Sequence, residues 1–191
     1  MVMRYWFDRR DDLNTRTLQA LLRRNIKFYK LNKVLELGCG PGIFTQTLSK
    51  SARVVALDTS KDMLKFVKKR RIKAEPLQAD IDHLPFRPNS FDAVVAYRVM
   101  EYSKDPIRTL RDFSRLAPIV FLQLPRHDSI NGFRLLLYRS ILAFFGSNPS
   151  FRSYSIKGAI GLGKKVGVKI KSVILYHNGL DIHMTLETHK H

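Results

Sequence analysis

The chain has little cysteine and no long apolar run. Among its 191 residues, Cys39 is the single cysteine, which excludes an internal disulfide and a zinc site built from several cysteines. No apolar stretch approaches the roughly 20 residues that a transmembrane helix needs. The first residues, MVMRYWFDRRDD, carry acids and arginines where a signal peptide has an apolar stretch. We therefore expect an intracellular, cytoplasmic protein.

Acidic residues are also few. Asp and Glu number 16 against 34 Lys and Arg, which gives a formal net charge of +18. Such an excess favours contact with RNA, an anionic membrane surface or an acidic substrate, although net charge governs encounter and not chemistry. The run KKRRIK at 68–73 and the lysines at 164, 165, 169 and 171 are candidates for following a phosphate backbone. The alternative is an ordinary solvated helix end and strand edge.

The apolar pattern predicts one α/β domain over residues 1–191. Strands are expected at 33–37, 53–57, 74–78, 91–97, 119–124, 168–176 and 182–188, the last two joined by a turn at 177–180. The apolar positions of the first five strands are consecutive and do not alternate, as is typical of parallel strands that are covered on both faces. We expect a Rossmann-like doubly wound sheet, mostly parallel with an antiparallel last strand, and helices on both faces.

Helices are expected at about 11–30, 44–50, 60–70, 105–117 and 156–167. The first is expected to place Leu13, Thr17, Leu21, Leu22, Ile26 and Tyr29 near one face of the helix. Ser60 and Asp105 are the predicted N-caps, with Pro106 in the first turn of the second helix. The segment at about 126–155 interrupts the alternation and is interpreted as a substrate-side insertion.

Three glycines follow the first expected strand in the stretch ELGCGPG. At Gly38, Gly40 and Gly42 the chain can take positive φ angles, and the missing Cβ atoms let a ligand lie against the backbone. Asp58 ends the second strand, 20 residues beyond Gly38. An acid at that distance suits hydrogen bonding to both hydroxyls of a ribose. The combination predicts a cofactor that contains a nucleoside.

The spacing disfavours two common nucleotide loops. A dinucleotide fingerprint needs a small third residue where this chain has Ile43, and a Walker phosphate loop needs Gly-Lys-Ser/Thr, which does not occur. Glu36, two residues before the first glycine, suits a cationic ligand group better than a pyrophosphate because like charges repel. A nicotinamide dehydrogenase stays as the disfavoured alternative.

The motifs ELGCGPG, ALD and QADIDHLPFRPNSFDAVVAYRVMEY resemble the class I S-adenosylmethionine-dependent methyltransferases. Within that class, the chain is similar to the branch of the ubiquinone and menaquinone biosynthesis methyltransferases (type 11), over about residues 30–125. The resemblance implies S-adenosylmethionine as cofactor and S-adenosylhomocysteine as product. It also implies cofactor contacts: Glu36, Gly38, Cys39, Gly40 and Gly42 at the methionine and ribose, Asp58 and Thr59 at the ribose hydroxyls, Met63, Asp80 and Ile81 at the adenine, Tyr97 and Arg98 beside the methionine, and Tyr5 as an N-terminal candidate.

No motif identifies a catalytic residue. Methyl transfer chiefly needs a nucleophile held in line with the sulfonium methyl group in a dry pocket. The D/N-P-P-Y motif of amino-methylating relatives is absent, since AYRVMEY follows the fourth strand. His127, next to Asp128 in the insertion, is the candidate general base. The histidines are too scattered to suggest a metal site.

The sequence does not identify the methyl acceptor. Residues 133–145, FRLLLYRSILAFF, are apolar nearly all round, which suits a lid over the substrate, a helix on a membrane surface or a dimer interface. We expect a small-molecule acceptor, of apolar character if this segment covers it. An RNA methyltransferase and a cofactor-binding module without turnover are the alternatives.

Overall fold

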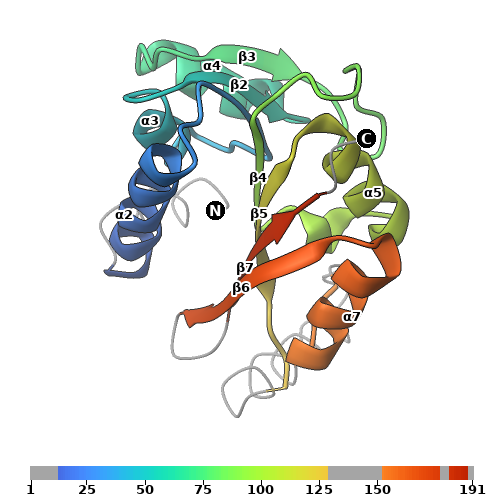
Figure 1. The fold of residues 1–191 in the computed structure, drawn as a ribbon. Coiled ribbons are helices and arrows are strands. Elements are labelled where there is room, and N and C mark those ends of the chain that lie inside the picture. Colours follow the sequence, from blue (N-terminus) through green and yellow to red (C-terminus); the bar gives the residue numbers. More distant parts are fainter. Residues whose placement is uncertain (1–12, 129–151, 177–180, 189–191) are drawn as a thin grey trace, which may run out of the picture.

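The structure is a computed structural model that describes residues 13–128, 152–176 and 181–188. In this part of the chain, seven strands form one sheet with helices on both faces (Figure 1). The strands are β1 (Lys33–Leu37), β2 (Arg53–Asp58), β3 (Glu75–Gln78), β4 (Ala93–Tyr97), β5 (Ile119–Pro125), β6 (Lys169–Tyr176) and β7 (Asp181–Glu187). The helices are α2 (Leu13–Phe28), α3 (Thr45–Leu48), α4 (Lys61–Lys69), the 3₁₀ turn η1 (Met100–Tyr102), α5 (Pro106–Leu116) and α7 (Ile156–Val166).

The strand order is β3-β2-β1-β4-β5-β7-β6. The first five of these strands run parallel, whereas β7 pairs antiparallel with both β5 and β6. The predicted fold class, a mostly parallel sheet with an antiparallel last strand, is confirmed. The chain winds outward in both directions from β1 and β4, so the topological switch point lies between these two strands.

Local signals set most helix boundaries. The Ser60 side chain accepts a hydrogen bond from the Met63 N–H, and the Asp105 carboxylate accepts from two backbone N–H groups in the first turn of α5. Both predicted N-caps are therefore present. The predicted helix at 44–50 is shorter, because the chain is still turning through Gly42 (φ 83°) and α3 begins only at Thr45.

Two apolar layers enclose the sheet. One lies between the sheet and α5 with α7, and the other lies between the sheet and α2, α3 and α4 (Figure 1). In α2, Leu13 and Thr17, two of the residues predicted to lie near one face of the helix, are exposed. The buried stripe of this helix consists of Leu18, Leu21, Leu22 and Ile26. Leu13 lies in the first turn and is 79% exposed, so among the described residues the sheet-facing contact of α2 begins only one turn later.

Several predictions fall on residues outside the described part: Tyr5, the apolar segment 133–145 and the turn at 177–180. Both ends of the insertion are described, and an isolated bridge between Arg126 and Tyr154 joins them. Among the described helices, none combines the length and the apolarity that crossing a membrane requires.

Candidate cofactor and acceptor site

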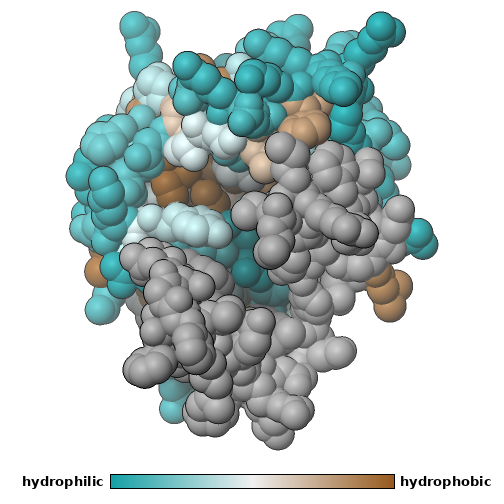
Figure 2. Space-filling view, turned by 180° about the vertical axis from the view of Figure 1, so that it is seen from behind, coloured by the Kyte–Doolittle hydropathy of each residue, from teal (hydrophilic) through white to brown (hydrophobic). Residues whose placement is uncertain are grey.

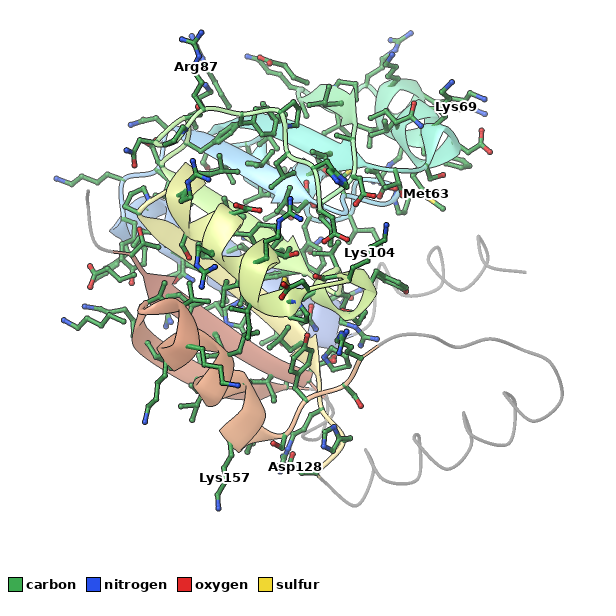
Figure 3. The ribbon with its side chains drawn as sticks, turned by 90° about the vertical axis from the view of Figure 1, so that its right-hand side faces the viewer. Met63, Lys69, Arg87, Lys104, Asp128 and Lys157 are labelled. Carbon is green, nitrogen blue, oxygen red and sulfur yellow. The ribbon has the colours of Figure 1, made fainter. Side chains whose placement is uncertain are left out.

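A cavity of about 420 Å³ opens at the carboxyl ends of β1, β2 and β4, beside the switch point. In doubly wound sheets this is the usual place for a ligand, and the volume suits a small molecule. Seen from behind the view of Figure 1, the surface is hollowed near its centre, where hydrophobic atoms lie below a hydrophilic rim (Figure 2). Met63 and Lys104 both line the cavity and lie on the same side of the molecule (Figure 3).

Eight of the predicted cofactor residues line this cavity. They are Gly38, Gly40, Asp58, Thr59, Met63, Asp80, Ile81 and Arg98. Glu36, Cys39, Gly42 and Tyr97 are not among the lining residues. The structure thus brings together residues that are up to 60 positions apart in the sequence, from Gly38 to Arg98.

The three glycines of the loop have different structural roles. All three have positive φ angles, at 67°, 52° and 83° in chain order. A Cβ on Gly38 would lie 2.9 Å from Val99 Cγ2, and one on Gly42 would lie 2.6 Å from Ile72 Cδ1. A Cβ on Gly40 would meet nothing within 4 Å. Two glycines therefore permit close packing, while Gly40 keeps the loop open toward the cavity, as a ligand lying against the backbone requires.

The Asp58 carboxylate is fixed by backbone donors. Its Oδ2 accepts a hydrogen bond from the Gly40 N–H at 2.8 Å, and its Oδ1 accepts one from the Ser60 N–H at 2.9 Å. Each oxygen keeps a further lone pair. An oriented carboxylate that lines the cavity beside an open glycine is suited to bind two neighbouring hydroxyl groups.

The opposite wall combines apolar and polar groups. Met63 and the buried Ile81 give the cavity apolar surface, while the exposed Asp80 offers a carboxylate. Asp82, which sequence reasoning missed, fixes this wall. Its carboxylate accepts hydrogen bonds from the Thr109 hydroxyl at 2.8 Å and from the Lys104 N–H at 3.2 Å. This wall suits a flat heterocycle that carries an amino group.

Glu36 is buried next to the glycine loop. Burial raises its pKa from 4.5 to about 8, an effect that the neighbouring Thr45 opposes and the negative charge of Asp58 reinforces. Its Oε2 atom is buried without a hydrogen-bond partner among the described residues. An uncompensated carboxylate oxygen of this kind fits a cationic group such as the ammonium of a bound methionine moiety.

Cys39 is a packing residue. It is 5% exposed, and burial raises the pKa of its thiol far above the ordinary value, with the charges of Glu36 and Asp58 adding to the increase. Because the thiolate is the reactive form of cysteine, this raised pKa makes Cys39 unsuited to act as a nucleophile.

Tyr97 points to the α2 side of the sheet. Its hydroxyl lies 2.6 Å from Nε2 of His183, a fully buried residue of β7 that sequence reasoning missed. Burial raises the pKa of Tyr97 and lowers that of His183 to about 4, so both groups are neutral near pH 7. The pair can therefore exchange hydrogen bonds, but it carries no charge.

Arg98 is the centre of a polar network at the end of β4. The residue has a φ angle of 56°, which is unusual outside glycine. Its Nε donates to Glu101 Oε1 at 2.8 Å, and its Nη1 donates to Asp181 Oδ1 at 2.9 Å. Gln123 Nε2 donates to the other oxygen of Asp181 at 3.1 Å. In the sequence, the only signal for this network was the three-residue spacing of Arg98 and Glu101.

His127, the candidate general base, and the adjacent Asp128 have different hydrogen-bond partners. Asp128 forms an ion pair with Arg126 and accepts a hydrogen bond from the Ile156 N–H at 3.1 Å, in the first turn of α7, whose N-cap is Ser155. His127 Nδ1 lies 3.1 Å from the Ser153 hydroxyl instead. In the described residues, therefore, Asp128 does not orient His127 as a general base.

Buried side-chain atoms without a hydrogen-bond partner gather at one edge of the sheet. Within the described residues they are Glu36 Oε2, Thr45 Oγ1, Glu101 Oε2, Tyr154 Oη and His183 Nδ1. All five lie at or just beyond the carboxyl ends of the parallel strands. His183 lies there because β7 runs antiparallel to β5 and starts at this end of the sheet. Since buried polar groups are nearly always paired in folded proteins, this concentration indicates an edge built to receive a polar ligand.

Comparison with known proteins agrees with this geometry. A family model described as a methyltransferase domain matches residues 35–118. The malonyl-(acyl-carrier protein) O-methyltransferase of Legionella pneumophila is 33% identical over 90 residues, which cover 44% of this chain and 32% of that protein. The chain spans about a third of the length of the curated relatives it matches first.

Solved structures share the fold at low sequence identity. Magnesium protoporphyrin IX methyltransferase from Synechocystis PCC 6803, crystallised with bound S-adenosylhomocysteine, matches with a TM-score of 0.73 at 14% identity. That match covers 92% of this chain and 83% of the other. A methyltransferase from Aquifex aeolicus matches with a TM-score of 0.64 at 16% identity, over 86% of this chain and 88% of that one.

The shared fold and the family match over residues 35–118 agree with the resemblance to the class I S-adenosylmethionine-dependent methyltransferases. The matching family model is of type 11, the branch that the motifs resemble, and it covers residues 35–118 of this chain. The comparisons agree with the family that the motifs resemble and with S-adenosylmethionine as its cofactor.

Proposed function

We propose that the chain transfers the methyl group of S-adenosylmethionine to a small-molecule acceptor that carries polar groups. One observation supports this most strongly. Asp58 is held by the N–H groups of Gly40 and Ser60, and it lines a cavity in which Gly40 leaves the backbone uncovered. This is the arrangement that a ribose diol next to a glycine loop requires.

The remaining cofactor contacts follow from the cavity wall. Asp58 would bind the ribose hydroxyls, Met63 and Ile81 would enclose the adenine, and Asp80 would accept from its amino group. Glu36 would bind the ammonium group, which supplies the partner that its buried Oε2 lacks. When bound, the cofactor offers a sulfonium methyl group to in-line attack.

The acceptor side is assigned to the ends of β4, β5 and β7. Three of the unpaired buried atoms lie there, on Glu101, Tyr154 and His183. Buried polar atoms are costly unless they are hydrogen-bonded, so an acceptor with hydroxyl, amine or carbonyl groups would complete them. Such an acceptor would be a small molecule, as expected, with polar groups in addition to any apolar part that segment 133–145 would cover. The chain's own contribution to the reaction is to hold the acceptor, exclude water and present the neutral Tyr97–His183 pair.

The test is isothermal titration with S-adenosylhomocysteine. We expect micromolar binding to the wild type and a loss of one to two decades in Asp58→Ala, since a hydrogen bond to a charged group contributes roughly 1.5–3 kcal/mol. Asp62→Ala is the matched control, because Asp62 is exposed, pairs with Lys65 and does not line the cavity. This control should bind as the wild type does.

Asp58 also orders its own loop, so thermal unfolding of each ligand-free variant must accompany the titration. Asp58→Asn serves as the second variant, because it keeps the shape and one carbonyl acceptor while it removes the charge. Absence of S-adenosylhomocysteine binding to a folded wild type, or tighter binding of NAD, would overturn the proposal. Binding without methyl transfer to any acceptor would favour a module that binds the cofactor without turnover.

A further inference from the structure

The amino edge of the sheet, opposite the cofactor cavity, carries a second hollow. An open groove of about 980 Å³ lies at the starts of β1, β2 and β3. The basic residues that line it, called the groove cations below, are Lys33, Lys50, Arg53 and Lys73. Glu75 is the one acidic residue among its lining residues. The groove therefore has a formal charge of +3 over a small area.

The groove cations are available to a partner. All four are exposed, and none takes part in an ion pair that the structure shows within the described residues. Elsewhere the basic surface is partly neutralised. Glu187, for example, lies within 4.0 Å of the ammonium groups of both Lys169 and Lys171. The Lys33 ammonium lies 4.9 Å from the Phe91 ring centroid, while the nearby Asp92 carboxylate accepts hydrogen bonds from the backbone N–H groups of Asn32 and Lys33.

The spacing of the cations suits a polyanion. Lys33 and Arg53 are register partners on adjacent parallel strands, and Lys73 lies two residues before β3, the next strand along. Neighbouring strands are about 4.8 Å apart, so the positive charges form rows across the edge. One strand of a nucleic-acid duplex carries a negative charge about every 3.4 Å of helix axis. Several of the groove cations can therefore lie near phosphates of the same strand at once.

The uncharged lining residues decide which polyanion fits. No aromatic side chain lines the groove, so bases have no surface on which to stack, as single strands require. Asn32 and Ser51 add an amide N–H and a hydroxyl that can donate hydrogen bonds to phosphate oxygens, whereas the Ser49 hydroxyl donates to the Gln46 carbonyl oxygen. A duplex, whose bases are stacked inside and whose backbone is exposed, matches this chemistry better than a single strand.

We propose that this groove binds the phosphodiester backbone of a double-stranded nucleic acid without reading its sequence. The site does not depend on the proposed function, because it lies at the end of the strands opposite the cofactor cavity. It also assigns a binding role to part of the excess of basic residues. A duplex held there is docked to the protein and is not the methyl acceptor.

The test is fluorescence anisotropy with a labelled 20-base-pair RNA duplex over a series of salt concentrations. The groove variant combines Lys33→Gln, Lys50→Gln, Arg53→Gln and Lys73→Gln. The control variant removes the same charge from exposed lysines of α7 and β6 and combines Lys157→Gln, Lys164→Gln, Lys165→Gln and Lys169→Gln. Both variants have the same net charge, so only the location differs.

We expect the groove variant to lose at least tenfold in duplex affinity at about 0.1 M salt. Its plot of log affinity against log salt should be shallower by about 3.6, since each of the four lost phosphate contacts contributes about 0.9 to the slope. The control variant should stay within about threefold of the wild type. Melting temperature and S-adenosylhomocysteine binding should not change in the groove variant, because the four side chains are exposed and distant from the cofactor cavity.

Three results would overturn the proposal. The first is no duplex binding by the wild type at 50 mM salt. The second is an equal loss in the groove and control variants, which would mean that net charge alone attracts the duplex. The third is competition by a single-stranded RNA, by polyglutamate or by phosphatidylglycerol vesicles as strong as that by unlabelled duplex, which would assign the groove to a different anion.

Discussion

The buried carboxyl group of Glu36 makes the stability of the ligand-free protein depend on pH. Its pKa in the folded chain is about 8 against 4.5 for the exposed group, because burial disfavours the charged form. Between these two values the unfolded chain has released a proton that the folded chain still holds. The free energy of unfolding therefore falls as the pH rises, by about 1.4 kcal/mol per pH unit.

Between pH 4.5 and pH 8 the free energy of unfolding falls by about 5 kcal/mol, which is a large part of the stability of a domain of this size. Glu36→Gln removes the titrating group and keeps the shape. The variant should match the wild type in stability near pH 4.5 and exceed it by several kcal/mol at pH 8. Urea unfolding of both proteins at half-unit pH intervals, followed by circular dichroism, measures the difference directly.

Two controls sharpen this experiment. Glu75→Gln replaces an exposed glutamate and should leave the pH profile unchanged. Saturating S-adenosylhomocysteine should flatten the profile of the wild type, because an ammonium group next to Glu36 would stabilise its ionised form. A difference between wild type and Glu36→Gln that does not change with pH, or that favours the wild type at pH 8, would refute the reasoning.

Two further predictions concern the glycine loop and a helix cap. Gly42→Ala should lower the melting temperature clearly, because its Cβ would lie 2.6 Å from Ile72 Cδ1 in a backbone conformation with φ 83°. Gly40→Ala should cost only about 1–2 kcal/mol from its positive φ, but it should weaken S-adenosylhomocysteine binding because its methyl group faces the cavity. Equal stability of the two variants would contradict this assignment. Asp105→Ala should destabilise the chain by about 1 kcal/mol in urea unfolding, since the carboxylate accepts from the N–H groups of Ile107 and Arg108. An unchanged midpoint would show that water replaces the cap.

Short-range patterns in the sequence determined the fold class and half of the site. Consecutive apolar residues predicted the parallel strands, and the caps at Ser60 and Asp105 predicted where two helices begin. The loop from Gly38 to Gly42 and the acid at Asp58 were found because their chemistry depends on residue type and spacing within one βαβ unit. Such signals are local: the backbone geometry of a turn, a cap or a strand end restricts the residues that can occupy it.

Only the tertiary structure decided the acceptor side and the groove. Tyr97 meets His183 across 86 positions, and Arg98 meets Asp181 across 83. Both contacts exist because β7 returns antiparallel beside β5 and brings its first residues to the carboxyl edge. The groove likewise joins the starts of three strands that are separate in the chain. Sequence spacing does not encode these pairings, since they depend on strand order and on which buried polar atoms the surrounding side chains leave without partners.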